Sequence, residues 1–282
     1  MVQKFWQCRD RNIDLSSPKI MGIVNVTPDS FSDGGKYYSS AQAIEHGLQL
    51  AEEGADILDV GGESTRPGAE EVSVHSELER VIPVIEALSA RGLVVSVDTS
   101  KPEVMTAAAQ AGAQIINDVY ALRRDGALEA AEKSGSGVCL MHMQGEPRTM
   151  QKNPVYTDLL SEVKSFLVER ARALTDLGVS AEKIVLDPGF GFGKTVSQNF
   201  ELLAKTEDFL SLGYPLLYGM SRKSSLGAVT GVAKAEERLI SSVTAHLLAV
   251  ERGASIVRVH DVKQMKEALT IYKAMVHYKD LK

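Results

Sequence analysis

The chain has 282 residues, with 31 lysines and arginines against 37 aspartates and glutamates, so its formal net charge is −6 at pH 7. This acidic balance argues against nucleic acid as a partner, because phosphate-backbone binding relies on clustered basic residues. No run approaches the roughly 20 apolar residues that span a membrane, and residues 1–12 lack the apolar core of a signal peptide. Two isolated cysteines, Cys8 and Cys139, form neither a CxxC site nor a disulfide framework. We expect a cytoplasmic protein.

Eight short apolar runs recur along the chain, and each is followed by a turn and then by a helical pattern. The runs are nearly continuous in Val, Ile and Leu, which is typical of strands that are buried on both faces. They cover residues 19–26, 55–62, 94–100, 114–120, 138–143, 183–189, 215–221 and 255–261.

The segments between the runs have apolar residues at helical spacing. One example is Leu160, Val163, Leu167, Ala171 and Leu174; a second is Leu239, Val243, Leu247 and Val250. Eight strands that alternate with helices predict an α/β fold, the (β/α)8 TIM barrel, and an open doubly wound sheet is the alternative. No linker interrupts the pattern, so we expect a single domain over 1–282, in which 1–18 form a short N-terminal extension.

Polar residues collect where the predicted strands end, whereas the first halves of the strands are almost entirely apolar. In a TIM barrel the site lies at the C-terminal ends of the strands, so this asymmetry predicts where the site is. The residues at these ends are Asn25, Glu63, Ser64, Thr65, Arg66, Asp98, Asn117, Asp118, His142, Asp187, Ser221, Arg222, Lys223, Arg258 and His260.

Both signs of charge occur in this set. Bases suited to an anion such as phosphate are Arg66, Lys223, Arg258 and His260. Groups suited to the amidine-like edge of a flat heterocycle are Asp98, Asn117 and Asp187. A carboxylate accepts two hydrogen bonds from such an edge, and an amide both donates and accepts.

Structural interpretations compete with these functional ones. Asp98 could instead cap the next helix, and Asp187, which precedes Pro188-Gly189, could form a turn. Asp118 is better explained as a structural brace than as a ligand contact. Three further residues remain open between packing and ligand contact: Met141, His142 and Phe192.

A possible nucleotide-binding motif is rejected. Residues 193–195, Gly-Lys-Thr, resemble the end of a phosphate-binding P-loop, but Pro188 stands where that motif needs glycine. The alternating glycines 189, 191 and 193 do not give GxGxxG either. We expect them to let the loop bend or to let the backbone approach a ligand.

Two connections, 27–40 and 63–75, are long and show no helical pattern. Long structureless loops in compact domains are usually functional. We expect both to be mobile active-site loops, in which Phe31, Arg66 and Pro67 cover or line a substrate pocket.

Motifs at nearly every predicted strand end together resemble those of the dihydropteroate synthase family, in the family's order over about residues 20–270. They are NVTPDSFSDGG (25–35), DVGGESTRPGA (59–69), VDTSKPEV (97–104), INDV (116–119), LMHMQGEPRTM (140–150), LDPGFGFGK (186–194), GMSRKS (219–224) and RVHDV (258–262). The resemblance implies a homodimer that makes 7,8-dihydropteroate from a dihydropterin methyl diphosphate and 4-aminobenzoate.

The resemblance also implies a role for each matching residue. The implied pterin-binding residues are Asp98, Asn117, Asp187, Lys223, Met141 and Phe192. The implied diphosphate-binding residues are Asn25, Arg66, Arg258 and His260, and Asn25 also resembles the ligand of a Mg²⁺ cofactor. The implied aminobenzoate-binding residues are Phe31, Thr65, Pro67, Lys223 and Ser224. The implied catalytic residues are Arg66, Asp98 and Lys223.

Two other functions fit parts of the pattern. A pterin-binding methyltransferase shares the barrel and the pterin carboxylates, but it needs no diphosphate clamp, so GMSRKS and RVH argue against it. A non-catalytic pterin-binding paralogue is contradicted by the complete set of cationic strand ends. For the reaction that the resemblance implies we expect a dissociative, SN1-like path, because the methylene cation left by diphosphate is conjugated with the pterin ring. An aryl amine needs no strong base, which fits the absence of a Ser/His/Asp or Cys/His constellation from the sequence.

Overall fold

The computed structural model describes residues 2–26, 36–64, 71–146, 149–150 and 154–280. At its centre, eight parallel strands lie in the order β8-β7-β6-β5-β4-β3-β10-β9. Their bounds are β3 (Lys19–Asn25), β4 (Ile57–Gly61), β5 (Val95–Asp98), β6 (Ile115–Asp118), β7 (Gly137–Met141), β8 (Ile184–Asp187), β9 (Leu217–Tyr218) and β10 (Ile256–Val259). A parallel bridge between Leu186 and Leu216 joins the two ends of the sheet. The predicted TIM barrel is therefore confirmed, and the open doubly wound alternative is wrong.

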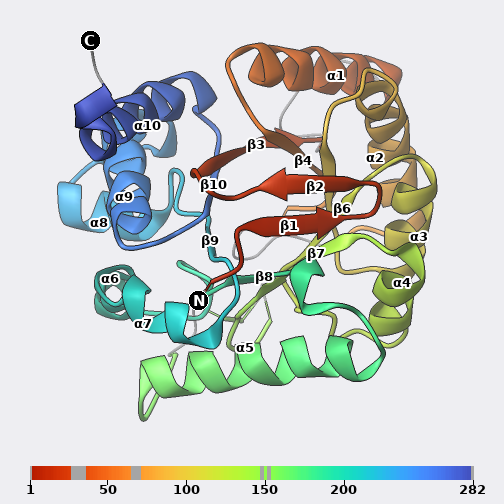
Figure 1. Cartoon of the computed structure of the whole chain (residues 1–282). Coiled ribbons are helices and arrows are strands. Elements are labelled where there is room, and N and C mark those ends of the chain that lie inside the picture. Colours follow the sequence, from red (N-terminus) through yellow and green to blue (C-terminus); the bar gives the residue numbers. More distant parts are fainter. Residues whose placement is uncertain (1, 27–35, 65–70, 147–148, 151–153, 281–282) are drawn as a thin grey trace.

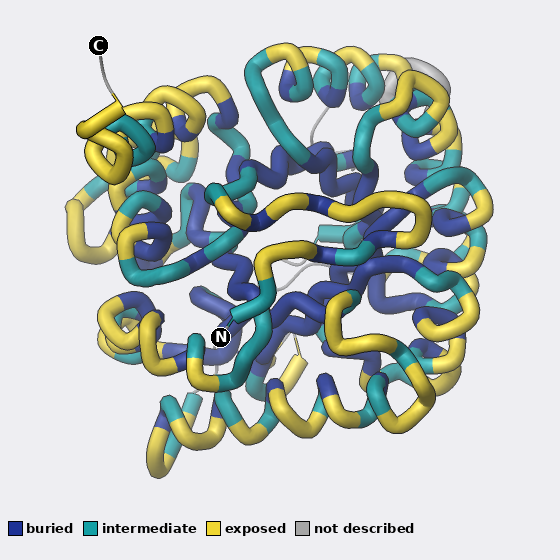
Figure 2. Tube along the Cα trace, in the orientation of Figure 1, coloured by how far each residue is buried: buried dark blue, intermediate teal, exposed yellow. Residues whose placement is uncertain are grey.

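Helices surround the barrel (Figure 1). They are α1 (Lys36–Glu52), α2 (Val74–Ser89), α3 (Pro102–Gln110), α4 (Ala127–Ser134), α5 (Leu159–Asp176), α6 (Val196–Ala204), α7 (Thr206–Phe209), α8 (Ser224–Thr230), α9 (Leu239–Glu251) and α10 (Val262–Val276). In Figure 2 the eight barrel strands are largely buried, whereas exposed positions lie on the outer faces of the helices, in connections and on the N-terminal hairpin. Within the described ranges, no helix is both long enough and apolar enough to cross a membrane.

The helical spacing predicted the inward face of α5 better than that of α9. On α5 the buried residues include Val163, Leu167, Ala171 and Leu174, as expected. On α9 the buried face is Ser242, Ala245, His246, Ala249 and Val250, so the predicted stripe lies to one side of the true one. The buried face of α9 includes a polar residue, His246, which an apolar pattern cannot predict. Its Nε2 accepts a hydrogen bond from the backbone N–H of Met220 inside the core.

The predicted loop boundaries need correction. The structure starts α1 at Lys36 and α2 at Val74, so residues 36–40 and 74–75 are helical and not part of the loops. Residues 36–40, Lys-Tyr-Tyr-Ser-Ser, contain neither glycine nor proline to prevent a helix. At α2, the Ser73 side chain accepts a hydrogen bond from the backbone N–H of Ser76 and so caps the helix.

The N-terminal extension closes one end of the barrel. Strands β1 (Phe5–Cys8) and β2 (Arg11–Asp14) form an antiparallel hairpin across the end at which the barrel strands begin (Figure 1). Trp6 and Cys8 are fully buried in a cluster with residues near the starts of the strands, such as Met21 and Ile57. The indole of Trp6 donates a hydrogen bond to the carbonyl of Lys183 at 2.9 Å. The opposite end, where the polar residues lie, is left for the site.

Candidate functional site

The strand register places four predicted site residues side by side in two pairs, Asp98 with Asn117 and Asp187 with Met141. Asp98 is the last residue of β5, where it pairs with Gly61 of β4 on one side and with Asn117 of β6 on the other. Asp187 is the last residue of β8 and pairs with Met141 of β7. Because all these strands are parallel, their carboxyl ends meet at the same end of the barrel.

Arg258 of β10 is held by two carboxylates from other strands. Its Nε donates to Asp59 Oδ2 at 2.5 Å, and its Nη2 donates to Asp98 Oδ2 at 2.7 Å. Asn117 Nδ2 donates to the same oxygen of Asp59 at 3.0 Å. These four side chains form one network, because the planar guanidinium offers several fixed donors and can bridge two acids.

Sequence reasoning missed Asp59. This residue is fully buried in the middle of β4, whereas the predicted site residues were sought only at the ends of strands. Its signal in the sequence was a carboxylate inside an otherwise apolar run, Ile-Leu-Asp-Val. A buried carboxylate needs a partner, and Arg258 supplies it.

The same network answers the question of whether Asp98 caps a helix. Helix α3 begins after Lys101, which makes no side-chain capping hydrogen bond, so the capping interpretation of Asp98 is wrong. Burial and the neighbouring carboxylates, Asp59 foremost, raise the pKa of Asp98 above its ordinary value, although Arg258 acts against this shift.

A second cluster forms around Asp187 and Lys223. The backbone N–H of Gly189 donates to Asp187 Oδ1 at 2.7 Å, so this carboxylate does support the turn that follows it. Lys223 Nζ donates to the carbonyl of Phe190 and lies 4.1 Å from the ring centroid of Phe192. Burial lowers the pKa of Lys223 to about 7, against the opposing effect of Asp187.

The glycines of the turn between β8 and α6 allow close approach of neighbouring groups. A Cβ added at Gly189 would lie 1.8 Å from the carbonyl oxygen of His142, and one at Gly191 would lie 2.6 Å from Lys223 Cδ. Both residues also have positive φ, +74° and +84°, which glycine adopts without strain. The alternating glycines therefore let Lys223 and the segment after β7 pack directly against this backbone.

The other predicted residues lie around the same end of the barrel. His260 follows β10, and its Nδ1 lies 2.9 Å from Ser221 Oγ. Asn25 is the last residue of β3 and is partly exposed, whereas Ser224 is exposed at the start of α8. Met141 and Phe192 are buried in an apolar cluster together with Val119, Met143 and Met150.

Asp118 does brace the structure, as the sequence indicated. Its two carboxylate oxygens accept hydrogen bonds from the backbone N–H groups of Tyr120 and Leu122 at 2.8 and 2.7 Å. Burial raises the pKa of this carboxyl to about 6, and these two hydrogen bonds oppose the shift. Asp118 thus holds the turn between β6 and α4.

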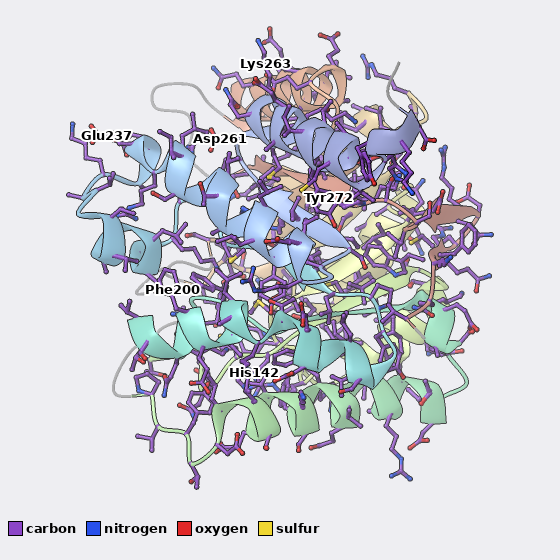
Figure 3. All side chains as sticks on the ribbon, turned by 60° about the vertical axis from the view of Figure 1, so that its left-hand side comes forward. His142, Phe200, Glu237, Asp261, Lys263 and Tyr272 are labelled. Carbon is purple, nitrogen blue, oxygen red and sulfur yellow. The ribbon has the colours of Figure 1, made fainter. Side chains whose placement is uncertain are left out.

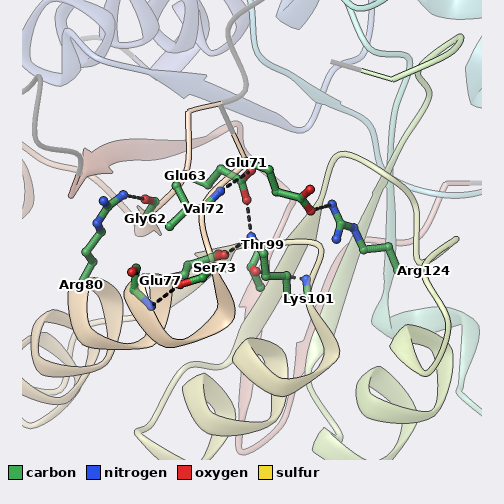
Figure 4. Close-up of polar contacts among 11 residues, drawn as sticks. Gly62, Glu63, Glu71, Val72, Ser73, Glu77, Arg80, Thr99, Lys101 and Arg124 are labelled. Atoms are coloured by element: carbon green, nitrogen blue, oxygen red, sulfur yellow. Dashed lines mark hydrogen bonds and ion pairs between the residues drawn. The ribbon is translucent and has the colours of Figure 1, made fainter. Parts of the chain in front are cut away.

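A group of charged side chains holds the residues that flank the segment 65–70 (Figure 4). The ammonium of Lys101 contacts carboxylate oxygens of both Glu63 and Glu77. The other oxygen of Glu63 accepts from the backbone N–H of Val72 at 3.4 Å. Glu63 thereby connects the residues on the two sides of this segment, and the nearly buried Lys101 carries the opposite charge.

A cavity of about 520 Å³ adjoins this group and extends to Asp98. Its lining also includes Tyr120, Arg123 and Arg124 from the connection after β6. Arg124 is paired with Glu71 at 2.8 Å. The cavity thus extends from the carboxylate of Asp98 to a wall that carries both signs of charge, and its volume is that of a small-molecule site.

Comparison with known proteins decides the family. The model of a family described as "Pterin binding enzyme" matches residues 21–260. The dihydropteroate synthase of Escherichia coli (strain K12) is 52% identical over 272 residues, 96% of this chain and 96% of that protein. The structure of Xanthomonas albilineans dihydropteroate synthase with 4-aminobenzoic acid has a TM-score of 0.91 and 51% identity, and the match covers 98% of this chain and 99% of that one. This chain belongs to the dihydropteroate synthase family.

A second structure from this family was solved with a reaction product. Xanthomonas albilineans dihydropteroate synthase in complex with 7,8-dihydropteroate has a TM-score of 0.88 and 49% identity, with 97% of this chain and 99% of that chain covered. The family resemblance found in the motifs is thus confirmed, and as a member of the dihydropteroate synthases the chain is a transferase.

Four residues that the family resemblance singled out cannot be placed. Phe31 of the first predicted loop and Thr65, Arg66 and Pro67 of the second lie outside the described residues. Their roles stay predictions.

The described part of the site does not supply a metal ligand set made of acidic, histidine and cysteine side chains alone. Within the ranges that the structure describes, no group of three or more His, Cys, Asp and Glu side chains could hold a metal ion. Asn25 offers one amide oxygen at a strand end. This fits Mg²⁺, which usually takes one or two protein ligands and completes its shell with water and substrate phosphates.

Proposed function

We propose that this chain condenses (7,8-dihydropterin-6-yl)methyl diphosphate with 4-aminobenzoate and releases 7,8-dihydropteroate and diphosphate, a step of tetrahydrofolate biosynthesis. The observation that carries the proposal is that the acidic and the basic residues contact one another, or the same backbone turn, at one end of the barrel. Arg258, from the cationic set, binds Asp98, from the acidic set. Lys223 in turn lies on the backbone turn that begins at Asp187. One small molecule can therefore touch both sets.

The acids bind the pterin in this proposal. Asp98, Asn117 and Asp187 accept from and donate to the ring edge, and the apolar side chains of Met141 and Phe192 form the walls. Asp187 still has one carboxylate oxygen beyond the one bound to Gly189. Ionised carboxylates beside the ring also stabilise positive charge on it, which is why Asp98 counts as a catalytic residue.

The bases bind the leaving group. Lys223, Arg258 and His260 lie at the ends of the last two strands, where TIM barrels often bind phosphate. Arg66 would add a further positive charge. Asn25 would hold Mg²⁺, which when bound neutralises diphosphate charge and so makes it a better leaving group. Together these groups favour departure of diphosphate before the amine attacks.

The reaction breaks the C–O bond to diphosphate and forms a C–N bond to the aryl amine. The methylene cation left behind is conjugated with the pterin, so a dissociative, SN1-like path needs charge stabilisation more than a base. The aryl amine is neutral near pH 7 and attacks with its own lone pair, after which its proton passes to solvent. We propose that Phe31, Thr65, Pro67, Lys223 and Ser224 bind the aminobenzoate.

Two finer points belong to the proposal. The chain works as a homodimer, and exposed apolar side chains on α9 and α10, such as Ile240 and Ile271, are 80% and 68% accessible in the single chain. Sedimentation would measure this association. The chain works in the cytoplasm, where its two buried cysteines remain free thiols.

The proposal is tested by mixing the purified protein with both substrates and Mg²⁺ and measuring 7,8-dihydropteroate and diphosphate. Formation of both products in equal amounts is expected. Pterin binding without release of diphosphate would instead support a non-catalytic pterin-binding protein. Transfer of a methyl group from a pterin to a corrinoid would support the methyltransferase alternative.

A further inference from the structure

Lys194 ends the glycine-rich turn 188–194 and plays no part in the reaction as proposed. In the sequence it belongs to the Gly-Lys-Thr that resembles a P-loop. A P-loop lysine reaches a phosphate, but this side chain is 2% exposed and its ammonium lies inside the protein. A buried lysine is costly unless it is fully hydrogen-bonded, so its partners indicate what it does.

Three acceptors surround the ammonium of Lys194. Nζ lies 2.9 Å from the carbonyl of Gly189, 2.9 Å from the carbonyl of Phe192 and 2.9 Å from Nδ1 of His142. Nζ also lies 3.5 Å from the carbonyl of His142. Burial lowers the pKa of Lys194 well below its ordinary value, and Asp187 opposes this shift. The protonated amine has three N–H donors, one for each of the three closer acceptors. Burial and the nearby Lys194 lower the pKa of His142 to about 2, which leaves its ring neutral and able to accept.

His142 connects this turn to the neighbouring strand and helix. It directly follows β7, and its backbone N–H donates to the carbonyl of Asp187 at 2.9 Å. Its ring meets Phe166 of α5 edge to face, with centroids 4.9 Å apart, and Figure 3 places it beside that helix. Lys194 therefore ties the turn to a rigid part of the barrel.

The turn that Lys194 ties down presents the groups that meet Lys223 and Asp187. The two carbonyls bound by Lys194 belong to Gly189 and Phe192, and between them the carbonyl of Phe190 accepts from Lys223. The N–H of Gly189 binds Asp187, and the Phe192 ring lies under Lys223.

We propose that Lys194 is a positioning residue for the pterin end of the site, where it fixes the turn 189–192 so that Asp187 and Lys223 keep their relative places. This inference rests on the proposed function and adds a residue that touches no substrate. The group that holds Glu63 is a separate cluster, built on β4, α2 and the start of α3. The proposal therefore predicts a larger effect on the pterin than on the aminobenzoate, for which Lys223 is one of five proposed ligands.

The test compares Lys194→Met with wild type and with Lys205→Met, which alters an exposed lysine just beyond α6. Calorimetry with 6-hydroxymethyl-7,8-dihydropterin measures pterin binding without catalysis. We expect at least about a tenfold rise in its dissociation constant and in the KM for the pterin diphosphate, since two carbonyls and an imidazole lose their shared hydrogen-bond partner. The KM for 4-aminobenzoate should rise less than the KM for the pterin diphosphate, because Lys223 is one of several residues proposed to bind it.

A second pair of variants decides the matter if Lys194→Met does not fold. His142→Phe removes one acceptor of Lys194, whereas His142→Gln supplies an amide oxygen in its place. We expect weaker pterin binding in the first and recovery in the second. Unchanged pterin affinity in the folded variants, or an equal rise in both KM values, would overturn the positioning role. If wild type binds the pterin but makes no product, the proposed function fails while the binding comparison still tests Lys194.

Discussion

Arg258 Nη2 donates to Asp98 Oδ2 at 2.7 Å, although the two residues are 160 positions apart in the sequence. They lie on β10 and β5, strands that are not neighbours in the barrel, so the contact crosses its interior. Arg258 also binds the fully buried Asp59 through Nε. One guanidinium thus binds two carboxylates, and these hold it in place. In the proposed function this is the point at which the diphosphate adjoins the pterin.

Replacement of Arg258 by alanine is expected to lower both stability and activity. It leaves two carboxylates in the barrel without their cation, so the free energy of unfolding should fall by about 3–5 kcal/mol. Arg258→Lys should recover only part of this loss and should remain poorly active, because a point charge cannot copy the fork that bridges both acids. Urea unfolding and steady-state kinetics measure the two effects.

Arg172→Ala is the matched control for this experiment. Arg172 lies on α5, and its ion pair with Asp176 is highly exposed, so its removal should change stability by less than about 1 kcal/mol. Equal unfolding free energies for Arg258→Ala and Arg172→Ala would contradict the bridging role.

Replacement of Asp187 by asparagine is expected to weaken pterin binding but to leave the fold intact. The amide oxygen of asparagine can still accept from the backbone N–H of Gly189, so the turn keeps its hydrogen bond. The other carboxylate oxygen is replaced by an N–H₂ donor, so a donor on the pterin loses its acceptor, at a cost of about 1–3 kcal/mol. Calorimetry with the dihydropterin measures this, with exposed Asp208→Asn as the control. Unchanged pterin affinity would refute the assignment.

The sequence predicted those parts of the molecule whose signal is local. Continuous apolar runs predicted the strands. Asp98, Asn117 and Asp187 were predicted as site residues because each lies at or next to the end of such a run. Asp59 was missed because nothing local marks its partner, Arg258, which comes 199 residues later. Lys194 was noticed for its motif, but the direction of its side chain depends on His142, 52 residues away. Such pairings depend on barrel closure, which no local pattern contains.

The activity is expected to fall as the pH rises through about 7. Burial lowers the pKa of Lys223 to about 7, so its ammonium, and with it the attraction for diphosphate, is lost above that pH in the free enzyme. The kcat/KM for the pterin diphosphate reports free-enzyme ionisations, so it should show this descending limb. The limb in kcat should lie at higher pH, because bound diphosphate stabilises the ammonium.

Lys223→Arg provides the check on this assignment, since a guanidinium stays charged throughout the range. The variant should be less active at every pH, and its kcat/KM should lack the descending limb. Burial raises the pKa of Asp98 to about 7 as well, so its ionisation should give an ascending limb in the same pH range in both proteins. The wild-type profile should therefore be bell-shaped near pH 7, and the arginine variant should keep the ascending limb alone. A descending limb that persists in the arginine variant would assign it to another group.

Lys101 gives a prediction in which stability and function can be separated. Its ammonium lies between Glu63 and the fully buried Glu77, and the hydrogen bonds with these two acids raise its pKa although burial opposes this. Lys101→Met leaves both acids unpaired, so the free energy of unfolding should fall by about 3–5 kcal/mol. Glu63 also loses the cation that holds it beside Val72. Because Glu63 precedes Thr65 and Pro67, which are proposed to bind the aminobenzoate, the KM for 4-aminobenzoate should rise. Exposed Lys133→Met on α4 is the control.

The double variant Lys101→Met, Glu77→Leu separates the two effects. With Glu77 removed as well, the only acid left without its cation is Glu63, whose side chain is partly exposed, so most of the lost stability should return, because hydrophobic replacements of buried ion pairs are often neutral. The KM for 4-aminobenzoate should nevertheless stay high, since Glu63 still lacks its partner. If the KM recovers together with the stability, Lys101 supports the fold alone and has no part in placing the residues that flank segment 65–70.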